Sequence, residues 1–163
     1  MQFKPVSIMV YGMPGSGKTW FCRAAAEAVG WERTLWLHTE RPILSFDAPV
    51  WTPDQPFGVR DMADLGTDDI VKVLVGLQAR AKRGEWDYDL VVLDGITEAE
   101  IVNLEAIKGD GGGRPKDMRQ AWGEQSDDLL RVFWGLRAGQ REPEPRHLGA
   151  ISIVTAGTRA VSH

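Results

Sequence analysis

The sequence predicts an α/β fold in three layers, with helices on both sides of a mainly parallel central sheet. Short apolar segments typical of buried strands alternate along the chain with segments of helical periodicity, as in a parallel sheet with helical crossovers. The segment Leu90–Leu93 is apolar without interruption, which is the pattern of a strand covered on both faces. At 163 residues, we expect a single domain that spans positions 1–163.

The first strand, helix and second strand follow each other closely. Val6–Tyr11 is mostly apolar and stops at a glycine, so it reads as a short buried strand. Lys18–Val29 is rich in alanine and other good helix formers and is followed by Gly30, a frequent residue at helix C-termini. Thr34–His38 is the second predicted strand.

The next segment is poor in regular structure. Residues 41–60 contain four prolines, so we predict mostly loop here, with Ala48–Trp51 as a short edge strand. An amphipathic helix is predicted over 68–83, because its apolar side chains recur at helical spacing.

The second half of the chain continues the alternation. After the strand at 90–93 we predict a helix over 98–107, a glycine-rich basic loop at 108–119 and a long helix that ends near Arg137. Ala150–Thr155 is the last predicted strand.

One motif carries a specific chemical meaning. The pattern G-x-x-x-x-G-K-[ST] is filled completely, between a predicted strand and a predicted helix, by Gly12, Met13, Pro14, Gly15, Ser16, Gly17, Lys18 and Thr19. Its glycines allow backbone N–H groups to point at phosphate oxygens, and the following helix adds its partial positive charge. Lys18 is expected to reach the β- and γ-phosphates, and the Thr19 hydroxyl to bind Mg²⁺. The motif predicts a nucleotide site.

Asp94 is the expected partner of this motif. It ends the apolar segment at 90–93, and a carboxylate at such a strand end holds the Mg²⁺ side of nucleotide sites that carry this loop. An apolar strand that ends in aspartate is common by itself, so the assignment depends on the phosphate loop.

Composition excludes several other classes of protein. The formal net charge of -4 gives no general attraction to nucleic acid or anionic membranes. The single cysteine, Cys22, rules out an internal disulfide and fits a reducing compartment. No apolar run approaches the roughly 18 residues of a membrane span, and the start of the chain does not read as a signal peptide. We therefore expect a soluble cytoplasmic protein.

Further sequence features distinguish between classes of nucleotide-binding proteins. The chain has no [NT]-K-x-D segment to read guanine, and Asp94 is followed by Gly95-Ile96-Thr97 instead of the D-x-x-G of GTPase switches. Small-molecule kinases usually carry an arginine-rich lid, and only the loop at 108–119 is suited to that task.

These features together resemble the RecA-like core of P-loop NTPases. The order is phosphate loop, a strand ending in glutamate ("LWLHTE"), a strand ending in aspartate ("LVVLDGITE"), a basic glycine-rich loop with a helix, and a last strand with a polar end. More narrowly, the chain is similar to compact phage-encoded AAA-type ATPases that act in single-strand annealing and recombination. The resemblance implies ATP hydrolysis with Mg²⁺, in the cytoplasm of the phage host.

The resemblance also assigns catalytic residues. Lys18 and Asp94 match the lysine and the metal carboxylate of such ATPases, and Glu40 matches the glutamate that activates the attacking water. Glu40 could instead cap its strand or pair with a neighbouring cation, and Glu98 is the competing carboxylate. Thr155 matches the polar residue that senses the γ-phosphate, although Gly157 stands where the family often has histidine.

The partners implied by the resemblance are single-stranded DNA and further copies of the chain. The DNA contacts would come from the loop at 108–119, through Lys108, Arg114, Lys116 and Arg119. A solvated loop without a ligand is the simpler alternative. Only eight residues follow Thr155, where a second DNA loop would begin, so the protein either lacks that loop or is a truncated or minimal version of the core. Annealing or simple DNA binding is therefore favoured over strand exchange. In a homo-oligomer, Arg137, Arg141 or Arg159 would supply a cation to the neighbouring site.

Two alternatives from other classes stay open. One is a nucleotide-dependent regulator or loader that does not act on DNA and hydrolyses slowly or not at all. The other is a small-molecule phosphotransferase that uses the loop at 108–119 as a lid.

Overall fold

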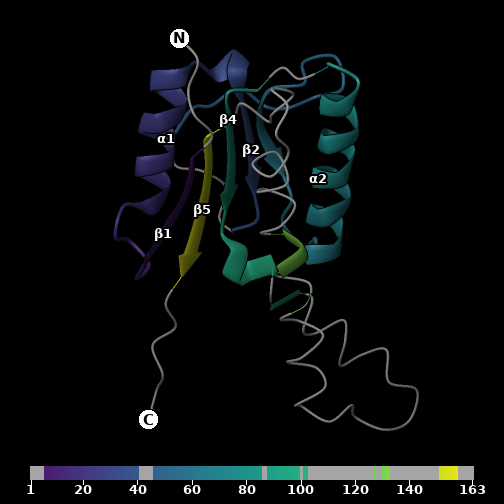
Figure 1. The fold of residues 1–163 in the computed structure, drawn as a ribbon. Coiled ribbons are helices and arrows are strands. Elements are labelled where there is room, and N and C mark those ends of the chain that lie inside the picture. Colours follow the sequence, from purple (N-terminus) through teal and green to yellow (C-terminus); the bar gives the residue numbers. More distant parts are fainter. Residues whose placement is uncertain are drawn as a thin grey trace, which may run out of the picture.

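The computed structural model describes residues 6–40, 46–85, 88–99, 101–102, 127, 130–132 and 151–157. Its centre is a five-stranded sheet with the strand order β1-β5-β4-β2-β3, and every pairing between neighbouring strands is parallel. Helices lie on both faces of this sheet (Figure 1). The prediction of an α/β fold with a parallel central sheet is therefore confirmed.

The helices and strands lie close to their predicted positions. The strands are β1 (Ser7–Gly12), β2 (Thr34–His38), β3 (Gly58–Asp61), β4 (Leu90–Asp94) and β5 (Ile151–Gly157). The two long helices are α1 (Lys18–Val29) and α2 (Thr67–Lys82), and a short 3₁₀ helix, η1 (Trp31–Arg33), precedes β2. The bounds of α1 and β2 are those predicted from the sequence, and β1, β4, β5 and α2 differ by one or two residues.

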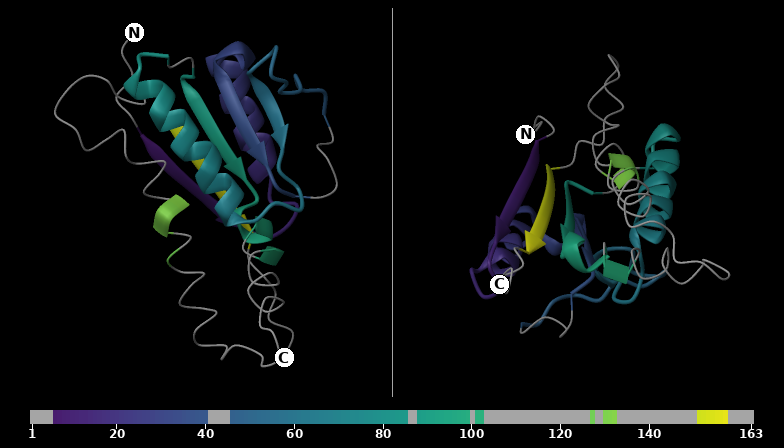
Figure 2. Two further views of the ribbon diagram at one scale, coloured as in Figure 1. Left: turned by 90° about the vertical axis from the view of Figure 1, so that its right-hand side faces the viewer. Right: turned by 90° about the horizontal axis from the view of Figure 1, so that it is seen from below.

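The two long helices lie on opposite sides of the sheet (Figure 2). Each of them covers its own apolar core, so the sheet separates two cores. Successive residues of a strand point to opposite faces, so Trp36 and Val92 pack with α1, whereas Leu37 and Leu93 pack with α2. On the α1 side, burial and then the charge of Asp94 raise the pKa of the Cys22 thiol to about 12. Cys22 is consequently a small core residue that stays protonated at neutral pH.

The prediction for residues 41–60 was wrong in two respects. Gly58–Asp61 forms β3, which the proline content of the segment had hidden. In place of the edge strand predicted at Ala48–Trp51, the structure has one isolated bridge, between Val50 and Val59. β3 forms because its backbone pairs with β2, and such pairing between distant segments leaves no local signal in the sequence.

The helix predicted over 98–107 begins earlier than expected. Residues 96–99 and 101–102 are helical, and the rest of that prediction lies outside the described residues. In the later helix, residues 127 and 130–132 are helical, and its predicted end near Arg137 also lies outside them. Among the described residues, no helix is both long enough and apolar enough to cross a membrane.

Candidate functional site

The candidate site begins at the turn between β1 and α1, which carries the glycine-lysine-threonine motif. Gly15 and Gly17 adopt positive φ values of 77° and 89°, a region that residues with a Cβ rarely enter. The amide of Ser16 donates to the carbonyl of Met13 at 3.1 Å, which closes the turn. The glycines of the motif thus stand where the backbone requires them.

Lys18 lies across the start of this turn. Its Nζ donates to the carbonyl oxygens of Gly12 and Met13, at 3.0 and 3.1 Å, and the residue is buried. These bonds hold the ammonium group beside the turn instead of leaving it free in solvent. A cation fixed at this point is suited to an anionic ligand.

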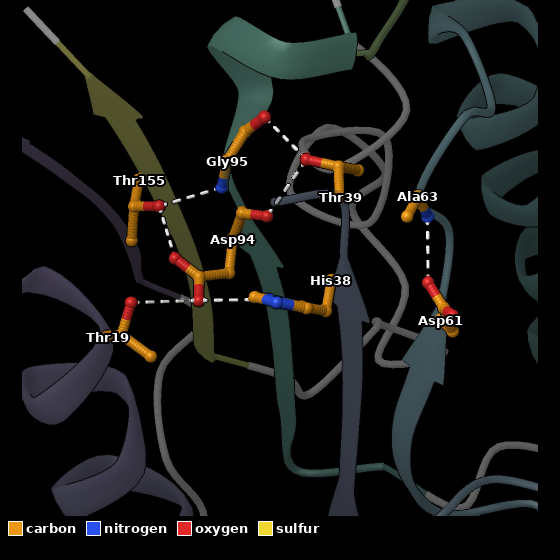
Figure 3. Close-up of polar contacts among 8 residues, drawn as sticks. All are labelled: Thr19, His38, Thr39, Asp61, Ala63, Asp94, Gly95 and Thr155. Atoms are coloured by element: carbon orange, nitrogen blue, oxygen red, sulfur yellow. Dashed lines mark hydrogen bonds and ion pairs between the residues drawn. The ribbon is translucent and has the colours of Figure 1, made fainter. Parts of the chain in front are cut away.

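The carboxylate of Asp94, at the end of β4, is the centre of the polar contacts (Figure 3). Thr19 Oγ1 donates to Asp94 Oδ2 at 3.2 Å, and Thr155 Oγ1 donates to Asp94 Oδ1 at 2.5 Å. Asp94 Oδ2 also lies 3.3 Å from Nδ1 of His38. Asp94 is fully buried, so these neighbours take the place of water around its oxygens.

The strand order explains why these residues meet. The carboxyl ends of parallel strands share one edge of the sheet, and His38 is in direct register with Asp94. β5 lies between β1 and β4, so Thr155 stands between the phosphate-loop turn and Asp94. The oxygen of Thr155 also accepts from the Gly95 amide at 2.9 Å. Thr155 therefore orients Asp94 directly, and its role as a γ-phosphate sensor stays a prediction.

The residues that follow β2 are joined to those that follow β4. The Thr39 amide donates to the carbonyl of Asp94 at 3.0 Å, and Thr39 Oγ1 donates to the carbonyls of Asp94 and Gly95 at 3.0 and 2.5 Å. Gly95 has a φ of 94°, and a Cβ there would lie 2.7 Å from Thr39 Oγ1 and closer still to Cγ of Glu40. The side chain of Glu40 is thus packed over Gly95.

Glu40 is a half-buried carboxylate close to several other charged groups. Burial raises its pKa above the ordinary value, and the negative charge of Asp94 raises it further. Lys18 and His38 act in the opposite direction, and Glu98 adds a smaller upward effect. Glu98 itself is exposed, and its amide donates to the carbonyl of Gly95 at 3.0 Å. Of the two candidate glutamates, Glu40 is the more enclosed one.

Three residues of this site were not singled out from the sequence. They are His38, Thr39 and Gly95. The sequence could have pointed to them only through their position, because His38 and Thr39 directly precede Glu40 and Gly95 directly follows Asp94. His38 is the least expected, because it is buried, with Nδ1 3.3 Å from Asp94 Oδ2 and no hydrogen-bond partner for Nε2 among the described residues. An unpaired buried polar atom costs about 1–3 kcal/mol, and the contact with Asp94 offsets part of this cost at Nδ1.

Substitution of Gly95 tests the packing of Glu40 and Thr39. We expect Gly95→Ala to lower the free energy of unfolding by about 1–3 kcal/mol, because it combines a positive φ with steric overlap. The matched control is Gly76→Ala within α2, where a new Cβ meets nothing within 4 Å. That control should raise stability by about 0.5–1 kcal/mol. Urea unfolding followed by circular dichroism measures both, and a Gly95→Ala protein as stable as the parent would contradict the described packing.

The donor atoms present suit a hard divalent cation shared with a phosphate. Thr19 and Asp94 offer a hydroxyl and a carboxylate oxygen in contact, and Mg²⁺ usually takes one or two carboxylates together with phosphate oxygens and water. No group of three or more His, Cys, Asp or Glu side chains placed to hold a metal ion occurs in the part of the chain that the structure describes. The contact between Thr19 and Asp94 fits the protein's share of a Mg²⁺ site whose other ligands come from phosphate and water.

The other predicted site residues cannot be placed. Lys108, Arg114, Lys116 and Arg119 lie outside the described residues, as do Arg137, Arg141 and Arg159. The structure thus brings together Lys18, Thr19, Glu40, Asp94 and Thr155. The DNA-binding loop and the arginine that a neighbouring copy would supply stay predictions. Neither a search against protein-family models nor a search of curated proteins finds a match to this chain.

Proposed function

We propose that this chain is an ATPase of the RecA-like P-loop type that binds ATP with Mg²⁺ and hydrolyses it. The observation that carries the proposal is the contact between Thr19 Oγ1 and Asp94 Oδ2, at 3.2 Å across 75 positions of sequence. It joins the motif expected to bind phosphate to the carboxylate expected on the metal side. A glycine-rich turn that matched the motif by chance would have no reason to meet a buried carboxylate here.

Each residue of the site has a defined task in this proposal. The backbone N–H groups of the turn and the ammonium of Lys18 would bind the β- and γ-phosphates and stabilise the charge that develops as the terminal bond breaks. Mg²⁺ would be held by Thr19 and Asp94 and would neutralise part of the phosphate charge. Thr155 would keep the Asp94 carboxylate in its orientation.

Glu40 would orient the attacking water and accept its proton. A general base works best when its pKa is near the working pH, and burial together with the charge of Asp94 raises the pKa of Glu40 in that direction. Its side chain packs over Gly95 and feels the charge of Asp94, which would put it near the terminal phosphate of a bound nucleotide. Glu98 is the alternative base, and its exposure makes it the weaker candidate.

Coupling of hydrolysis to single-stranded DNA, in phage-type annealing, recombination or replication, is a further part of this proposal. Its support is the sequence of the loop at 108–119, which combines four glycines with the cations Lys108, Arg114, Lys116 and Arg119. A homo-oligomer is proposed on the same resemblance. The two rival functions, a nucleotide-dependent regulator or loader and a small-molecule phosphotransferase, share the phosphate site and differ in what happens to the terminal phosphate.

Phosphate release from ATP by the purified chain separates these functions. We expect turnover that requires Mg²⁺, stops with EDTA and rises when single-stranded DNA is added. Turnover indifferent to DNA, together with no salt-sensitive DNA binding, would overturn the DNA coupling and leave the ATPase in place. Binding of ATP without turnover would favour the regulator, and release of phosphate only to an added small-molecule acceptor would favour the phosphotransferase.

A further inference from the structure

Trp20 is an exposed aromatic residue at the edge of the phosphate-loop turn. It follows Thr19 directly in the first turn of α1, and 54% of its surface is accessible. The buried face of α1 is formed by Lys18, Cys22 and Ala26, so packing of the helix does not require an indole at this position. A single exposed apolar residue is ordinary by itself, so the case for a function depends on what surrounds it.

The indole is held in place by a cluster on one of its sides. Its ring centroid lies 5.6 Å from that of Phe46, and the guanidinium carbon of Arg23 lies 4.8 Å from both ring centroids. Arg23 is fixed in turn by Glu27, at 2.7 Å. Phe46 packs against Trp36, with ring centroids 5.8 Å apart. The Trp20 indole is therefore held by Phe46 and Arg23 while more than half of the residue stays accessible to solvent.

The position of the Trp20 backbone relates the indole to the phosphate site. The hydrogen bonds of α1 begin with the amide of Phe21, which donates to the carbonyl of Gly17 at 2.9 Å. The amides of Lys18, Thr19 and Trp20 precede that bond and are the donors that a helix N-terminus offers to phosphate. A phosphate bound by the Trp20 amide would leave its sugar and base next to the indole of the same residue.

We propose that Trp20 is the stacking platform for the base of the nucleotide bound at the phosphate-loop turn. This inference rests on the proposed function. It adds a contact to the base of the nucleotide, whereas the phosphate-loop motif contacts only the phosphates. Stacking on an indole recognises the flat face of a base and does not read its hydrogen-bonding edge. The platform therefore favours nucleotides with a large purine face and contributes affinity without any contact to the phosphates.

A comparison of ATP with inorganic tripolyphosphate tests this proposal, because the second ligand has the phosphates and no base. We expect Trp20→Ala to weaken ATP binding by about tenfold or more, the range that loss of one base–aromatic stack produces. Affinity for tripolyphosphate should not change. Trp20→Phe should recover part of the ATP affinity, because phenylalanine keeps a smaller aromatic face. Isothermal titration calorimetry with Mg²⁺ present measures all of these affinities.

A fluorescence measurement adds a matched control. Trp51 also carries an arginine over its ring, with the guanidinium carbon of Arg60 at 4.4 Å, but it packs against the core on the α2 side of the sheet. ATP should quench tryptophan emission in the parent protein and in Trp51→Phe. The quenching should be lost or strongly reduced in Trp20→Phe.

The possible results separate this proposal from the proposed function. If the parent protein binds neither ATP nor tripolyphosphate, both are overturned. If Trp20→Ala binds ATP as the parent does, the platform is overturned and the phosphate site stands. If Trp20→Ala loses affinity for ATP and for tripolyphosphate equally, Trp20 maintains the shape of the turn and the platform is overturned. If the variant changes its oligomeric state in gel filtration and keeps its ATP affinity, Trp20 belongs to an interface and the platform is also overturned.

Discussion

Replacement of Glu40 by glutamine should lower ATP hydrolysis by about 10²-fold or more and leave ATP affinity almost unchanged. Glutamine has the same size, so it should keep the packing over Gly95 and the contacts of the neighbouring Thr39. It cannot accept a proton from water, and it carries no charge with which to orient it. Single-turnover hydrolysis and equilibrium ATP binding, measured on the same preparation, separate the chemical step from affinity.

Glu98→Gln is the matched control for this experiment. Glu98 is exposed and contributes only a minor effect to the pKa of Glu40, so its substitution should leave hydrolysis within about twofold of the parent. A large loss in Glu98→Gln with normal turnover in Glu40→Gln would move the catalytic role to Glu98.

The pH dependence of kcat/KM gives a second readout on the same pair of variants. Glu40 must be ionised to act as a base, so activity should fall as the pH decreases through its pKa in the free enzyme. Burial and the charge of Asp94 raise this pKa, so the decline should occur at a higher pH than for an ordinary glutamate. The same decline should be absent from the residual activity of Glu40→Gln and present in Glu98→Gln.

Replacement of Lys18 by alanine should abolish measurable ATP affinity, a loss of about 10²-fold or more. The variant loses the hydrogen bonds to the carbonyls of Gly12 and Met13 as well as the charge that would face the phosphates. Lys72→Ala is the control, because Lys72 is exposed on α2 and paired with Asp69. Calorimetry with Mg²⁺ and ATP compares the two, and normal ATP binding by Lys18→Ala would contradict the assigned site.

Much of the fold could be predicted from local patterns in the sequence. The bounds of α1 follow from helix propensity and those of β2 from a short, mostly apolar segment, and both are as expected. Parallel pairing alone places the carboxyl ends of the strands at one edge of the sheet, where ligand sites gather. The candidate role of Glu40 at that edge came from the resemblance to RecA-like ATPases. These predictions needed no knowledge of which strand lies beside which.

The contacts that depend on strand order could not be predicted. The register of His38 with Asp94, and the bonds from Thr39 to the carbonyls that follow β4, exist only because β2 and β4 are adjacent. Local periodicity does not report such adjacency. The requirement for glycine at position 95 could not be predicted for the same reason. It arises because Thr39 and Glu40, which follow β2, pack against Gly95, which follows β4.

The position of β5 in the sheet has a consequence for biosynthesis. β1 and β4 are both paired with β5, and the side chains of Ser7 and Ser152 bond at 2.8 Å across 145 positions of sequence. A nascent chain that has not yet released residues 151–157 from the ribosome lacks the strand that joins the phosphate-loop turn to Asp94. Contacts of such long sequence separation form late and slowly. The proposed ATP site is therefore expected to assemble after translation of β5, so a ribosome-bound chain stalled before this strand should not retain ATP.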